Sequence, residues 1–163
     1  MHEDWLYLLR DELVSEYYLN IKRQIASIEG RGIDVLPQRN LRFWCFKTFP
    51  FDISVVIVGQ DPYPNDADED IKWSRPKIGS LEKWLKNVLL LNSILIVERG
   101  KSGSHNRLGW QKSTDKIIKL VGDKREVSGH PSPLNRDRSF DNSRCFSLAN
   151  EYLKKVNKKM IDW

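Results

Sequence analysis

The segment from Val55 to Pro64, VVIVGQDPYP, limits the possible folds more than any other stretch of the chain. Four apolar residues in succession are typical of a strand that is buried on both faces, as in a parallel sheet. The run stops at Gly59 and continues into a polar turn that Pro62 and Pro64 stiffen, because proline fixes its own φ angle. The segment therefore predicts a strand of a parallel sheet that ends on a rigid turn carrying an acid, Asp61.

The rest of the chain alternates between helical and strand-like patterns. Apolar residues at helical spacing over 5–28 predict two short helices or one bent helix, with Gly30 as a stop. Further helices are expected at 80–87, at 142–159 and from Ser113 or Thr114 to 122, with a brief one after Pro37. Strands are expected at 52–59, in the apolar run that starts at Val88 and ending near Asn92, and at 125–129. Strands that alternate with helices indicate a three-layer α/β/α fold around a small parallel sheet with right-handed crossovers.

Length and composition limit the number of domains, the kind of partner and the state of the cysteines. A chain of 163 residues, 40% of them hydrophobic, is long enough for one core, so we expect a single domain over 1–163. Lysine and arginine number 27 against 22 acids, and the resulting charge of +5 permits a polyanionic partner without requiring one. Cys45 and Cys145 lie in apolar surroundings without metal-ligand spacing, which favours buried free thiols in a reducing compartment.

The N-terminus and the apolar runs bear on location. The first twelve residues carry acids where a signal peptide needs positive charge, and no apolar run approaches the length that spans a membrane. We therefore expect an intracellular protein, in the cytoplasm or nucleus, without a membrane partner.

Polar residues follow each of the three predicted strands. They are the Gln60–Pro64 turn, Asn92, and the segment GHPSPLN at 129–135. Loops that leave the carboxyl ends of parallel strands converge on one crevice, where ligands bind. Taken singly, an Asp, Asn or His at a strand end is more often a cap or turn residue than a catalyst.

Taken together, these segments resemble a known family. In their order and in many of their residues, four segments resemble the motifs of the family-1 uracil-DNA glycosylases: VVIVGQDPYP, VLLLNSILIV, GSHNRLGWQKSTD and GHPSPL. The family is also matched by Trp5, by the segment KTFPFDISVVIVG and by the terminal segment KKMIDW, so the resemblance spans nearly the whole chain. The resemblance implies a monofunctional base-excision-repair enzyme that removes uracil from DNA by hydrolysing the N-glycosidic bond, without metal or cofactor.

The resemblance assigns the catalytic roles to two residues. Breaking an N-glycosidic bond leaves positive charge on the sugar and negative charge on the base, and a site must stabilise both. By resemblance, Asp61 stabilises the oxocarbenium-like sugar and positions or activates the attacking water. His130 donates a hydrogen bond to the uracil oxygen that gains charge, for which a neutral imidazole suffices.

Four further residues would recognise the base. The amide of Asn92 can donate one hydrogen bond and accept another, which matches the edge of uracil and not that of cytosine. By resemblance, Tyr63 excludes the methyl group of thymine, and Gln60 contributes its backbone near the base and water. Trp73 stands one residue from where the family has a stacking phenylalanine; it either stacks on uracil or is an ordinary surface or core tryptophan.

A glycosylase must also extrude its target base from the duplex. Leu134 matches the apolar side chain that the family inserts into the minor groove. By resemblance, Ser132 and Ser80 contact phosphates, and Asn135 stands where the family has a phosphate-binding serine.

The chain departs from the family in two further ways. Pro64 replaces the usual histidine after the tyrosine. Between Gly122 and Val127 the chain is too short for the family's next strand and its phosphate-gripping glycine-serine loop, so the sheet has three strands, or four if residues 116–121 form one. Fewer phosphate contacts favour single-stranded DNA.

Two functions from different classes follow. The first is a shortened, working, monomeric glycosylase that acts on uracil-containing DNA. The alternative is a non-catalytic relative that serves as a DNA-binding or replication-complex module. Asp61 and His130 are both present, which favours the first. The host and any protein partner stay open.

Overall fold

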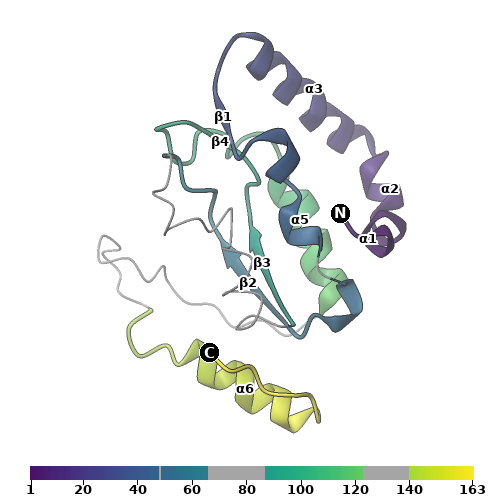
Figure 1. Cartoon of the computed structure of the whole chain (residues 1–163), viewed down its shortest axis with the longest axis vertical. Coiled ribbons are helices and arrows are strands. Elements are labelled where there is room, and N and C mark those ends of the chain that lie inside the picture. The colour runs from purple at the N-terminus through teal and green to yellow at the C-terminus, as the bar shows by residue number, and fades with distance from the viewer. Residues whose placement is uncertain (48, 66–86, 123–139) are drawn as a thin grey trace. The chain divides into compact units, whose positions relative to one another are not determined.

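The computed structural model describes residues 1–47, 49–65, 87–122 and 140–163 (Figure 1). The chain divides into two compact units, Met1–Gly122 and Asp123–Trp163. The single domain expected over 1–163 stays a prediction.

The first unit contains the predicted parallel strand pair. Strand β2 (Val55–Gly59) lies beside β3 (Val88–Asn92), with Val55 opposite Val88 and Gly59 opposite Asn92. Both strands were expected from their apolar runs, and both end where the polar residues begin.

The second predicted strand ends at Asn92, as expected, although the apolar run continues to Val97. The chain turns after Asn92, and a separate strand β4 (Val97–Glu98) pairs antiparallel with β1 (Val35–Leu36). Ile94, Leu95 and Ile96 are buried in the core although they lie outside any strand. Burial alone thus explains why these residues are apolar, and an apolar run does not distinguish a buried turn from a strand.

Three helices replace the one or two expected at the N-terminus: α1 (Glu3–Leu8), α2 (Arg10–Leu13) and α3 (Glu16–Gly30). The break before α3 lies at Ser15, whose hydroxyl accepts a hydrogen bond from the Tyr18 N–H and donates one to the Glu12 carbonyl. Serine is a favoured N-cap because its oxygen satisfies a backbone donor that the helix leaves free. Helix α3 ends at Gly30, as predicted.

The brief helix predicted after Pro37 is present as two 3₁₀ turns, η1 (Arg39–Leu41) and η2 (Trp44–Lys47), and a third, η3 (Pro50–Asp52), precedes β2.

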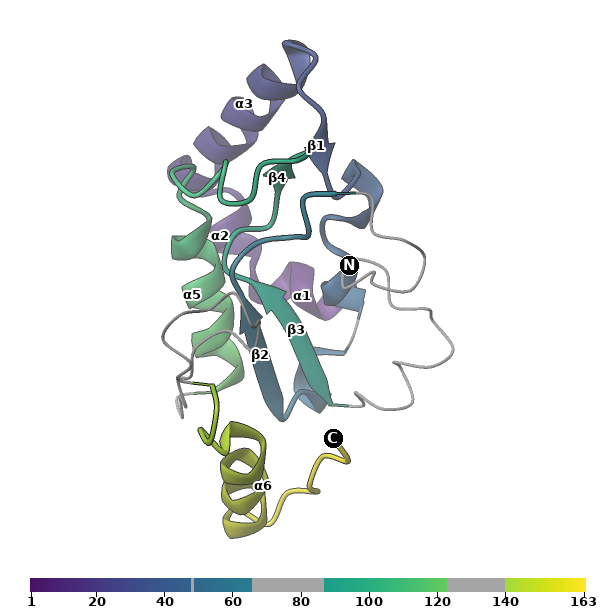
Figure 2. The ribbon, with the colours of Figure 1, turned by 90° about the vertical axis from the view of Figure 1, so that its left-hand side faces the viewer.

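Helix α5 (Trp110–Val121) runs alongside the strand pair in both views (Figures 1 and 2). It begins at Trp110 and not at the predicted Ser113 or Thr114, because Gly109 adopts φ +94° and serves as the N-cap. Residues 116–121 are helical, so the alternative in which they form a fourth strand is wrong. The strand predicted at 125–129 and the helix predicted at 80–87 lie outside the described residues.

The core of the first unit joins these helices to the sheet. Leu89 and Leu91 alternate along β3 and therefore point to the same face. They belong to a buried cluster with residues of α1, α3, η2 and α5, among them Trp5, Ile21, Ile25, Phe46, Trp110 and Ile117.

One buried carboxylate connects α2 to α5. Glu12 is 4% exposed, and its side chain accepts hydrogen bonds from the Ser113 hydroxyl at 2.8 Å and from the Lys116 ammonium at 2.6 Å. Burial, with a smaller contribution from the Glu12 charge, raises the pKa of Tyr18 to about 12. Ser113, which the sequence suggested as a helix cap, instead holds two helices together.

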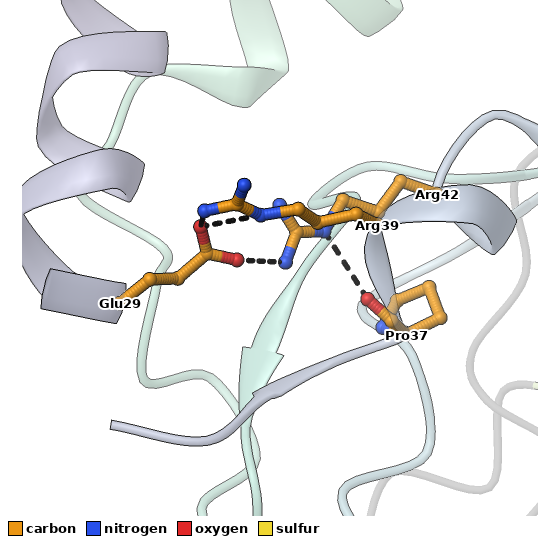
Figure 3. A network of polar contacts seen from close by, with 4 residues as sticks. All are labelled: Glu29, Pro37, Arg39 and Arg42. Atoms are coloured by element: carbon orange, nitrogen blue, oxygen red, sulfur yellow. Dashed lines mark hydrogen bonds and ion pairs between the residues drawn. The ribbon is translucent and has the colours of Figure 1, made fainter. Parts of the chain in front are cut away.

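A second carboxylate, Glu29, connects the end of α3 to η1 (Figure 3). It accepts hydrogen bonds from the guanidinium groups of Arg39 and Arg42, and the Arg42 Nε also donates to the Pro37 carbonyl at 3.2 Å. The two arginines lower the pKa of Glu29 to about 2.

The described part of the second unit contains α6 (Cys145–Lys155), shorter than the helix predicted over 142–159. The chain then turns back along α6: the Asn150 side chain bonds both the N–H and the carbonyl of Ile161 at 2.8 Å, and the ring centroids of Phe146 and Trp163 lie 4.7 Å apart.

Among the residues described, none of the helices has the length and apolar character needed to cross a membrane.

The two cysteines are free, as predicted, but each is half-buried and not fully buried. Burial raises the pKa of the Cys45 thiol to about 12.

Candidate active site

The candidate site begins where β2 and β3 end side by side. Gly59 and Asn92 are paired residues at the two carboxyl ends. Backbone hydrogen bonds continue the pairing beyond the strands, from the Ser93 N–H to the Gly59 carbonyl at 2.8 Å and from the Ile94 N–H to the Gln60 carbonyl at 3.0 Å. The predicted convergence of two motifs, the Gln60–Pro64 turn and Asn92, is therefore present in the structure.

A side chain at position 59 would meet the side chain of Asn92. A Cβ atom there would lie far inside van der Waals contact with the Oδ1 atom of Asn92. The Asn92 amide thus lies directly against the Gly59 backbone, and glycine at this position is what allows it to lie there.

Asp61 is half-buried and surrounded by hydrogen-bond donors. The Ser102 hydroxyl lies 3.2 Å from Oδ1 and 3.1 Å from Oδ2, and the Gly103 N–H donates to Oδ2. The side-chain amide of Gln60 donates to Oδ1 at 3.3 Å. Both oxygens of the Asp61 carboxylate therefore accept hydrogen bonds from protein donors.

Two of these donors come from a loop, residues 98–104, that begins at the end of β4 and that we call the bracing loop. Its Gly100 N–H donates to the Pro64 carbonyl at 2.6 Å, so the loop contacts the Asp61 turn at a second point. Within the loop, the Lys101 ammonium pairs with Glu98 at 2.6 Å and the Ser104 hydroxyl accepts from the Glu98 N–H at 2.8 Å. The bracing loop is therefore itself ordered by internal contacts.

The sequence alone does not assign a role to Ser102 or Gly103. Ser102 directly precedes the matched segment GSHNRLGWQKSTD, and Gly103 is its first residue, but Ser102 lies 41 residues from Asp61, so spacing alone does not link them. The available signal in the sequence is the pair of glycines at 100 and 103, which indicates a tightly turned loop. Both glycines adopt positive φ in the structure.

His105, directly after this loop, is buried and its Nδ1 lies 3.1 Å from the Ser104 hydroxyl. Burial lowers the pKa of His105, and the Glu98 carboxylate opposes this in part. Its burial and its contact with the Ser104 hydroxyl give His105 a structural role.

The other predicted site residues fall into two groups. Tyr63, on the same turn as Asp61, is 48% exposed, and Gln60 is exposed as well. The remaining residues lie outside the described part of the chain: Trp73, Ser80, His130, Ser132, Leu134 and Asn135.

Comparisons with known proteins bear on the family. No family model matches the chain. It is 36% identical to a uracil-DNA glycosylase of Campylobacter jejuni over 217 residues, which covers the whole of this chain and 94% of that protein. It is 32% identical to a uracil-DNA glycosylase of Clostridium perfringens, with 99% of this chain and 96% of that protein covered.

The fold agrees with solved structures. The crystal structure of a mimivirus uracil-DNA glycosylase superposes with a TM-score of 0.81 at 22% identity, covering 100% of this chain and 87% of that one. A structure of a variant of that protein in complex with UGI gives the same TM-score.

The length of the alignment also indicates that this chain is shorter than its relatives. The match to the Campylobacter protein extends over 217 residues, 54 more than the 163 that this chain possesses. Because the match nevertheless covers both proteins almost completely, the chain belongs to the family-1 uracil-DNA glycosylases, as a compact member.

Proposed function

We propose that this chain excises uracil from DNA by hydrolysing the N-glycosidic bond. The observation that carries the proposal is the pairing of Gly59 with Asn92, which sets the Asp61 turn and the Asn92 amide at adjacent strand ends. Relatives at 31–36% identity that bear the name uracil-DNA glycosylase support the same activity.

In the proposed reaction, the bond between the sugar C1′ and the uracil nitrogen breaks and its electron pair leaves with the base. The Asp61 carboxylate stabilises the positive charge on the sugar and orients the water that adds to C1′. His130 donates a hydrogen bond to the uracil oxygen on which negative charge develops. Neither step requires a cofactor or a metal.

Substrate choice is assigned to the remaining predicted residues. The Asn92 amide pairs with the edge of uracil, Tyr63 excludes a 5-methyl group, and the Gln60 backbone lies near the base and water. Trp73 stacks on the extruded base. Leu134 enters the minor groove while Ser80, Ser132 and Asn135 contact the phosphates.

We further propose that residues 1–163 act as a single catalytic domain and as a monomer, because the family motifs run from Trp5 to Trp163. DNA as the substrate implies an intracellular site of action, in the cytoplasm or nucleus.

The test is uracil release from a single-stranded oligonucleotide with one uracil, followed by alkali to cleave the abasic site, with a thymine oligonucleotide as control. Asp61→Asn and His130→Leu should each lower the rate about 10²–10³-fold without unfolding the chain. A parental chain that releases no more uracil than Asp61→Asn would favour the alternative, a non-catalytic DNA-binding or replication-complex module.

A further inference from the structure

The Ser102 hydroxyl is the one donor to Asp61, among those described, that comes from a side chain of a distant segment. It lies within 3.2 Å of both carboxylate oxygens, whereas the Gly103 N–H reaches only Oδ2 and the Gln60 amide only Oδ1. A donor placed between the two oxygens resists rotation of the carboxylate about its terminal bond, which is otherwise a soft torsion.

The loop that carries Ser102 is anchored on both sides of it. The Gly100 N–H donates to the Pro64 carbonyl, and the Ser104 hydroxyl accepts from the Glu98 N–H. The Arg99 side chain pairs with Asp34 at 2.6 Å, and the Arg99 N–H donates to the Asp34 carbonyl, which connects the loop to the segment before β1. Ser102 is therefore held from a rigid support, which is the condition under which a positioning contact is effective.

We propose that Ser102 is a positioning residue for the reaction: its hydroxyl holds the Asp61 carboxylate in the orientation that faces the sugar. This rests on the proposed uracil excision and deepens it. Ser102 does not touch the substrate; it acts through Asp61, so its loss should slow the chemical step and leave substrate binding nearly unchanged.

Position 102 offers a matched pair of variants. Ser102 is exposed, so both alanine and threonine fit, and only threonine keeps the hydroxyl. Ser102→Ala should lower kcat about tenfold, since a displacement of about 1 Å in a catalytic group costs up to roughly a hundredfold and the Gly103 N–H still holds Oδ2. KM should change by less than about twofold, and Ser102→Thr should restore kcat to within about threefold of the parent.

Lys101→Gln serves as the control for a general loosening of the loop, because it removes the ion pair with Glu98 without touching Asp61. Its kcat should stay at the parental value. The experiment measures kcat and KM on the single-stranded uracil oligonucleotide, together with the thermal unfolding midpoint of each variant.

Several results would overturn the positioning role. These are a parental kcat in Ser102→Ala, a threonine variant as slow as the alanine variant, or a rise in KM at unchanged kcat. The same holds if Lys101→Gln slows the reaction as much as Ser102→Ala. Absence of uracil release from the parental chain, relative to Asp61→Asn, would instead overturn the proposed function and this inference with it.

Discussion

At the scale of single residues, the position of the Asn92 amide depends on the absence of a side chain at Gly59. The Asn92 amide lies where a Cβ of any other residue at position 59 would be, so the glycine of the VVIVG strand is a requirement of the neighbouring strand and not only of its own turn.

Gly59→Ala should therefore displace the Asn92 amide and lower kcat/KM for uracil by about tenfold or more, since so close a clash forces the side chain to move. Gly30→Ala is the control, because a methyl group at that position, where α3 ends, would meet no atom within 4 Å outside the backbone of its own helix. Steady-state kinetics on both variants checks this, and equal rates for Gly59→Ala and the parent would contradict it.

Asn92 and Tyr63 should set the choice of base. Asn92→Asp changes the edge offered to the base and should admit cytosine, and Tyr63→Ala should admit thymine because it opens room for a methyl group. The measurement is release of each base from matched oligonucleotides. A variant that stays active on uracil and strictly specific for it would show that the assignment is wrong.

At the scale of elements, buried or half-buried carboxylates hold the helices in place. Glu12 connects α2 to α5, and Glu29 connects α3 to η1 (Figure 3). Neither connection touches the candidate site, so both should affect stability without a direct effect on the chemistry.

The Glu29 contacts predict a pH dependence of stability. The pKa of Glu29 is lowered from an ordinary 4.5 to about 2, so the folded state binds this proton less readily than the unfolded state. The stabilisation is fully present above pH 4.5 and is lost as the pH falls from about 4.5 towards 2. The unfolding midpoint of the parent should fall over this range.

Glu29→Gln removes the titrating group and keeps its size. At pH 7 it should unfold a few degrees lower than the parent, roughly 2–4 °C, and the difference should shrink as the pH approaches 2. Glu16→Gln is a control, because Glu16 makes an exposed pair with Arg23. A Glu29→Gln variant that follows the parental pH profile would contradict the prediction.

At the scale of the whole molecule, the chain is short for its family. The relatives' alignment contains 54 residues more than this chain, and the segment from Gly122 to Val127 leaves no length for the family's glycine-serine loop. Fewer groups are then available to contact the phosphates beside an extruded base.

Single-stranded uracil should for this reason be the better substrate by a wide margin. Extrusion from a paired duplex costs a few kcal/mol, which phosphate contacts help to offset, while an unpaired base costs less. Binding should be weak with a shallow dependence on salt, given a net charge of +5. Excision from matched single- and double-stranded oligonucleotides across a salt series measures both.

Equal rates on the two substrates, or a steep salt slope, would contradict this. They would point to another part of the chain as the source of phosphate contacts, with the basic stretch at 135–144 as the first to test by replacing Arg136 and Arg138.

Local patterns in the sequence were enough to predict the two parallel strands and the polar residues at their ends, because a strand run, its stopping glycine and a family motif all lie within a few residues. The sequence also favoured three strands over four, and residues 116–121 are helical. The strand from Val88 ends near Asn92 as predicted, and the residues beyond it, Ile94, Leu95 and Ile96, are equally apolar because they are buried outside any strand.

Which distant groups meet became known from the tertiary fold alone. Ser102 reaches Asp61 across 41 residues, and Ser113 reaches Glu12 across 101, where the sequence suggested a helix cap. Periodicity in the sequence indicates which face of an element is buried, but not which distant segment packs against it. The hydrogen bonds from Ser102 and Gly103 to the Asp61 carboxylate come from such a distant segment, so only the tertiary structure could show them.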